Sequence, residues 1–182
     1  MKLGRLICRT IVGGLFLGHG TQKLFGWFGG PGLEGTTQMM DKLELRPPRE
    51  QALVASWAET AGGAMLVLGF LTPLAAAMLT GSMVTAIRKV HLPNGLWNMN
   101  QGYEYNLALI ASLAAIIDGG PGEPSVDSAL GIQCTGPGWT LASLAAGAAG
   151  STLAIEVGGR ADQPQDGDRA AAAARPEAAV PA

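Results

Sequence analysis

An apolar run from position 52 to position 71 contains a single formal charge, the carboxylate of Glu59. The run has about the 20 residues that a helix needs to cross the hydrocarbon core of a bilayer. A charged side chain at the centre of a bilayer costs about 2.5–3.5 kcal/mol on insertion scales. We therefore expect Glu59 to face other helices rather than lipid, and to hold a proton or a charged partner there.

Further low-charge runs predict that several helices surround Glu59. The first covers residues 6–28 and follows a basic start, with Lys2, Arg5 and Arg9, that resembles a secretory signal. Because the run continues and no small-residue cleavage site follows, we interpret it as an uncleaved first transmembrane helix. The remaining predicted spans cover residues 73–87, 102–117 and 137–157.

These runs predict an all-α fold, a polytopic membrane helix bundle with four core transmembrane helices and a fifth, C-terminal helix. Residues 1–131 would form the four-helix core and residues 132–157 the fifth helix. Residues 158–182 are rich in Gly, Ala and Pro and are expected to form a disordered tail. The segment 36–45 is too short to span; it is either a short helix at the membrane interface or a structured loop.

Small residues recur at helical spacing in two of the predicted spans. Gly14 and Gly18 form a GxxxG motif in the first span, and Ala142, Ala146 and Gly150 form a similar stripe in the fifth. Small residues at this spacing let helix backbones approach closely. We expect both stripes to pack against neighbouring helices.

The composition excludes several classes of function. Charged residues make up 14% of the chain, against about 25% in a soluble domain. The net charge of −2 gives no broad basic surface for nucleic acid. Cys8 and Cys134 lie far apart and in no CxxC motif, so they indicate neither a disulfide framework nor a metal site.

Ionisable side chains at one end of the predicted spans form the candidate site. Because consecutive spans run antiparallel, the end of the first, the early part of the second and the start of the fourth lie at similar depths. Four side chains are expected to converge there as ligand-binding candidates, with three aromatic residues as candidate walls: His19, Lys23, Glu59 and Glu104, with Trp57, Trp97 and Tyr103.

Such a pocket would offer proton donors and acceptors to a quinone headgroup or to another small polar ligand. Simpler interpretations stay open for each member of the set. Lys23 can be a snorkelling anchor, His19 a packed interior side chain, and Glu104 a charge that complements its helix dipole. The whole cluster can also serve only to fix helix register. No residue is assigned a catalytic role.

Four short motifs in order resemble the DoxX family of integral membrane proteins. They are G-H-G-T-Q-K-L at 18–24, E-T-A-G-G-A-M-L-V-L-G at 59–69 followed by Thr72-Pro73, G-Y-E-Y at 102–105, and a closing G-P-G-E-P-S-V-D at 120–127. The resemblance covers residues 5–131 and implies a four-helix core in the bacterial inner membrane. It also implies a quinone-linked oxidoreductase subunit or a membrane partner of redox enzymes.

The sequence has no haem, dinucleotide or metal motif, so electron transfer would need a quinone in the bundle or a cofactor on a partner. We expect a redox-linked, quinone-associated membrane protein or a membrane anchor for soluble redox enzymes. The alternatives are a small-molecule transporter and a structural membrane protein without catalysis. The lipid bilayer is the expected partner, and a homo-oligomer is left open.

Overall fold

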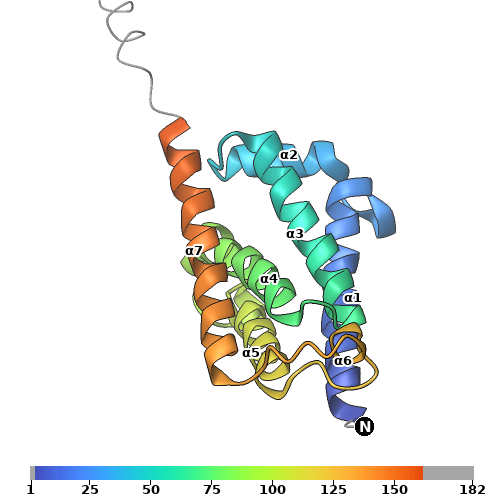
Figure 1. Cartoon of the computed structure of the whole chain (residues 1–182). Coiled ribbons are helices and arrows are strands. Elements are labelled where there is room, and N and C mark those ends of the chain that lie inside the picture. Colours follow the sequence, from blue (N-terminus) through green and yellow to red (C-terminus); the bar gives the residue numbers. More distant parts are fainter. Residues whose placement is uncertain (1–2, 162–182) are drawn as a thin grey trace, which may run out of the picture.

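The computed structural model describes residues 3–161, and within that range the secondary structure is helical, without strands. Five helices correspond to the predicted spans: α1 (Leu3–Phe25), α3 (Pro48–Leu68), α4 (Thr72–Ala86), α5 (Glu104–Gly119) and α7 (Pro137–Ala161). Two shorter helices, α2 (Gly32–Lys42) and α6 (Val126–Ala129), close opposite ends of the bundle (Figure 1). The all-α prediction is confirmed.

Helices α1 and α3 pack antiparallel at glycines, but not at the predicted GxxxG motif. A Cβ atom added to Gly63 would lie 2.5 Å from the backbone nitrogen of Leu17, and one added to Gly13 would lie 2.8 Å from that of Val67. By contrast, Gly14 and Gly18 have no neighbour within 4 Å of a Cβ position. The prediction for Gly14 and Gly18 is wrong because both lie on the other face of α1.

Helix α7 stands alongside α4 (Figure 1). Its close contact is at Gly147, where an added Cβ would lie 2.6 Å from the carbonyl oxygen of Ala77. Gly150, which the predicted stripe included, has no neighbour within 4 Å of that position. The helix also extends to Ala161, into the segment predicted as tail. The rest of that predicted tail, from residue 162, lies outside the described residues.

The short segment predicted between residues 36 and 45 is a helix rather than a loop. As α2 it begins earlier, at Gly32, and packs across the ends of α1 and α3. The buried hydroxyl of Thr36 donates to the carbonyl oxygen of Lys23 at 3.2 Å, which ties α2 to the last turn of α1. A small core of Met40, Leu45 and Ala52 lies beneath it.

At the opposite end, the loop after α5 is fixed by a buried arginine. Arg9 is 2% exposed, and its guanidinium donates to the carbonyl oxygens of Pro121 at 2.8 Å and Pro124 at 2.7 Å. These bonds hold the loop against the start of α1. The positive charge of Arg9, which the sequence places in a basic N-terminal segment, therefore stabilises the packing of the bundle.

The turn between α3 and α4 is capped from α6. The carboxylate of Asp127 accepts hydrogen bonds from the backbone nitrogens of Leu71 at 2.7 Å and Thr72 at 3.0 Å, and from the Thr72 hydroxyl at 2.7 Å. Asp127 therefore satisfies N–H groups that the first turn of α4 leaves without partners inside the helix.

One helix of the described residues is, by length and composition alone, apolar enough to cross a membrane: Pro137–Glu156 of α7. The fifth span, which the sequence indicates most weakly, is thus the one that meets this criterion. Helices α4 and α5 have 15 and 16 residues. Immediately after α4, however, a π-helical segment, η2 (Ile87–His91), continues the same helical path.

Candidate functional site

Glu59 lies near the middle of α3 and is 2% exposed, which makes it the least accessible charged group among the predicted site residues. The ammonium nitrogen of Lys23 donates to both carboxylate oxygens, at 2.6 Å and 2.5 Å. The hydroxyl of Ser82 on α4 donates to one of the same oxygens at 2.5 Å. Glu59 thus has a charged partner from α1 and a neutral partner from α4, as a buried carboxylate requires.

The close approach of α1 and α3 brings Lys23 to Glu59. An added Cβ on Gly20 would collide with Thr60, so only a glycine permits this helix separation one turn before Lys23. The carbonyl of Lys23 is held by Thr36, and 23% of its side chain is exposed. The side chain of Lys23 therefore extends from the last turn of α1 into the bundle, toward Glu59.

The ion pair forms part of the wall of a cavity of about 850 Å³. Most of the lining is apolar and comes from every long helix of the bundle, with Phe16, Met40, Leu74 and Leu109 as examples. Polar side chains other than the ion pair also line the cavity, at positions separate from the pair. A cavity of this size and character is typical of small-molecule sites in proteins.

Two further predicted residues line this cavity and three do not. His19 and Trp57 are part of its lining. Glu104 is exposed, and its carboxylate accepts a hydrogen bond from the backbone nitrogen of Asn98 at 2.9 Å. Trp97 and Tyr103 also lie outside the lining. The structure does not bring Glu104, Trp97 and Tyr103 into the set, because the loop before α5 folds back on the first turn of that helix.

Sequence reasoning missed two polar residues that reach the cavity. Ser82 binds Glu59 directly, and the buried amide of Asn106 donates to the sulfur of Met83 at 3.3 Å. Asn106 follows the G-Y-E-Y motif by one position, and Ser82 is one of several hydroxyl residues in α4. In both cases a polar residue inside an apolar run indicated a possible site residue. A hydroxyl side chain can also bond the backbone of its own helix, however, so its position in the run does not by itself predict a contact with another helix.

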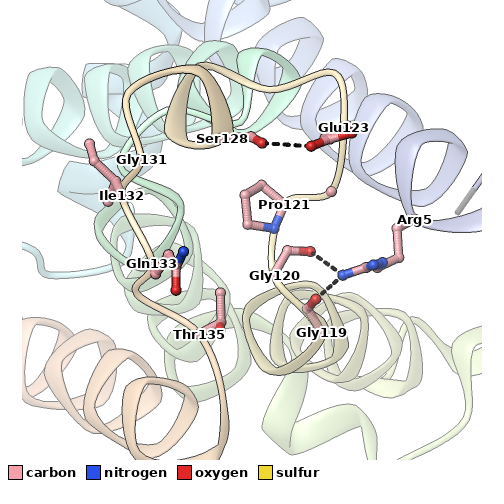
Figure 2. A pocket seen from close by; sticks show the side chains of 11 residues that line it. Arg5, Gly119, Gly120, Pro121, Glu123, Ser128, Gly131, Ile132, Gln133 and Thr135 are labelled. Carbon is pink, nitrogen blue, oxygen red and sulfur yellow. Dashed lines mark hydrogen bonds between the residues drawn. The ribbon is translucent and has the colours of Figure 1, made fainter. Parts of the chain in front are cut away.

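A second, smaller cavity of about 460 Å³ lies at the other end of the bundle (Figure 2). Figure 2 shows Arg5 reaching the carbonyl oxygens of Gly119 and Gly120, and Ser128 donating to Glu123. The Arg5 guanidinium is engaged by the backbone of the loop, as that of Arg9 is. We therefore regard this cavity as part of the structural closure of the bundle.

Together these features define an all-helical bundle in which a buried lysine–glutamate pair faces an apolar cavity. The family model described as DoxX matches residues 4–92, in agreement with the resemblance that the sequence motifs indicate. This match supports a location at the membrane. No curated protein and no solved structure matches the chain. The match includes Lys23, Glu59 and Ser82, and ends before the G-Y-E-Y motif.

Proposed function

We propose that the protein is a multi-pass protein of the bacterial inner membrane whose cavity binds a quinone in a redox-linked role. One observation carries the proposal: a buried, hydrogen-bonded ion pair lies in the wall of a mostly apolar cavity of about 850 Å³. A quinone has the matching two-part chemistry. Its ring and tail are apolar, while its two oxygens accept hydrogen bonds when oxidised and donate them when reduced.

The residues around Glu59 supply hydrogen-bonding groups of both kinds. The ammonium of Lys23 has three hydrogens and directs two of them to Glu59, so the third suits a quinone carbonyl. The carboxylate of Glu59 and the oxygen of Ser82, whose own hydrogen is donated to Glu59, are acceptors, which suit a quinol hydroxyl. All three groups belong to helices of the bundle, so their positions are held by helix packing. In this proposal the electrons come from a partner redox enzyme, and the chain contributes binding and hydrogen bonding.

Fluorescence of the purified protein in neutral detergent provides the test, because quinones quench indole emission and Trp57 lines the cavity. We expect decylubiquinone to quench the emission saturably, and we expect Trp57→Phe to remove most of that quenching. Mass spectrometry of the protein after gentle extraction should also detect co-purified quinone.

The variants separate a ligand site from a pair that only holds helices together. Glu59→Gln and Ser82→Ala should each weaken decylubiquinone binding, the first about tenfold, which corresponds to about 1.4 kcal/mol. Ser82→Ala leaves the ion pair in place, so it tests the site even if Glu59→Gln is poorly folded. Glu104→Gln is the matched control: its carboxylate lies outside the cavity, and binding should not change.

No saturable quenching by any quinone, together with no quinone in the extract, would overturn the proposal. Saturable binding that is the same in Glu59→Gln, Ser82→Ala and native protein would also overturn it, because the pair would then have no part in the site. Solute flux in liposomes without quinone binding would instead support the transporter alternative.

A further inference from the structure

The π-helical segment η2 brings two basic side chains into the lining of the same cavity. Lys89 and His91 both line it, whereas Arg88, the residue before Lys89, donates to the hydroxyl of Thr152 on α7 at 3.0 Å. A π-helical turn widens the helix locally, and such turns frequently occur at functional sites. Here the turn is bonded to α7 through Arg88, and its next residues line the cavity.

The charges that line the cavity do not balance. Glu59 is the only carboxylate among the lining residues, and Lys23 already pairs with it. Lys89 is half-buried, and within residues 3–161 no hydrogen bond or ion pair reaches it. Nδ1 of His91 donates to the carbonyl oxygen of Gln101 at 2.7 Å, so Nε2 of the neutral ring is an acceptor, and Lys89 is the donor that remains for an anionic group.

We propose that the cavity selects an amphiphile whose headgroup carries an ionised oxygen, and that Lys89 is the residue that binds this oxygen. The inference rests on the proposed function, since it specifies the charge of the ligand in that same cavity. An unpaired ammonium in a largely apolar cavity is stabilised by an opposite charge more strongly than it would be in water. Both an ionised hydroxyquinone and a carboxylate amphiphile have this chemistry.

A pair of probes that differ mainly in charge isolates the effect. At neutral pH 1,4-naphthoquinone is uncharged and 2-hydroxy-1,4-naphthoquinone is an anion, and both quench Trp57 when bound. Each variant is compared with native protein in the same neutral detergent, so partitioning into micelles cancels. In Lys89→Gln we expect the anion to bind about tenfold more weakly, with the uncharged quinone changed less than about threefold.

Three further variants provide controls. Lys89→Arg keeps the positive charge and should keep the preference for the anion. His91→Gln leaves Lys89 in place and should also keep that preference. Arg88→Gln removes the neighbouring cation, which bonds Thr152 and does not line the cavity, so the preference should remain as in native protein.

The outcomes distinguish this inference from the proposal on which it rests. If both quinones bind and Lys89→Gln weakens both equally or neither, the anion selection is wrong while the quinone site stands. If neither quinone binds, but decanoate binds more tightly than decanol and depends on Lys89, the selection of an ionised oxygen holds and the quinone proposal fails. If no probe of either pair binds, both are wrong.

Discussion

At the residue scale, buried charges in this bundle are each held by several hydrogen bonds. Asp127 is 2% exposed and accepts three, two from backbone nitrogens and one from the hydroxyl of Thr72. Bonds to a charged acceptor contribute more than neutral ones, and loss of the acceptor leaves buried donors without partners. Asp127 is therefore a residue where a single substitution should be costly.

We expect Asp127→Ala to lower the free energy of unfolding by about 2–4 kcal/mol. The matched control is Asp118→Ala, since Asp118 is exposed at the end of α5 and its side chain makes none of these bonds. Unfolding midpoints in the same detergent measure both variants. Equal midpoints for the two variants would mean that the cap of α4 by Asp127 does not contribute to stability.

Individual residues also show how much of the candidate site can be predicted from the sequence. Glu59 could be identified because a lone charge in an apolar run must find a partner, and Lys23 because it lies at the matching depth of an antiparallel neighbour. Glu104 satisfies the same depth argument, yet it bonds to Asn98 in its own loop. All side chains around one helix end lie at a similar depth in the bundle. The direction in which each side chain points depends on the conformation of the neighbouring loop, which the sequence pattern does not specify.

At the scale of elements, the spans of α1, α3, α4, α5 and α7 follow from hydropathy, but their contact faces do not. Many small residues in α1 satisfy the spacing of a packing motif, and only the structure tells Gly13 and Gly20, which contact α3, from Gly14 and Gly18, which do not. Helix α6 has only four residues, too few for periodicity to indicate. The π-helical turn of η2 has no sequence pattern of its own.

The crossing of α1 and α3 gives the prediction at this scale. In Gly63→Ala the new methyl group would lie 2.7 Å from the carbonyl oxygen of Gly13, so the two helices must separate. We expect a loss of about 1–3 kcal/mol in the free energy of unfolding. Separation of the helices should also lengthen the contact between Lys23 and Glu59 and so weaken ligand binding.

Gly14→Ala is the matched control on the same pair of helices. A methyl group there meets no atom within 4 Å, and alanine favours a helix more than glycine does. This variant should be as stable as native protein or slightly more stable, as measured by the thermal midpoint in detergent. A larger loss for Gly14→Ala than for Gly63→Ala would contradict the packing of α1 against α3.

At the scale of the whole molecule, Lys23 lies in the last turn of α1, at the end of the bundle that α2 closes, and Arg5 and Arg9 lie at the end that α6 closes (Figure 1). If all five predicted spans cross the membrane, Lys42, Arg46, Arg49, Arg88 and Lys89 lie on the same side as the Lys23–Glu59 pair. The other side has Lys2, Arg5 and Arg9. Arg5 and Arg9 are both bound to loop carbonyls there, so they are engaged in the fold.

From the positive-inside rule we therefore predict that the side with Lys23 and the C-terminus is cytoplasmic and that the N-terminus is outside. We expect a green fluorescent protein fused to the C-terminus to fluoresce, and alkaline phosphatase inserted after Gly131 to be active, because α7 lies between the two positions. Both proteins should stay in the membrane pellet after a carbonate wash. Reporters that place both positions on one side would mean that α7 packs against α4 without crossing the bilayer. Inverted signals would reverse the orientation and place the Lys89 side of the cavity in the periplasm.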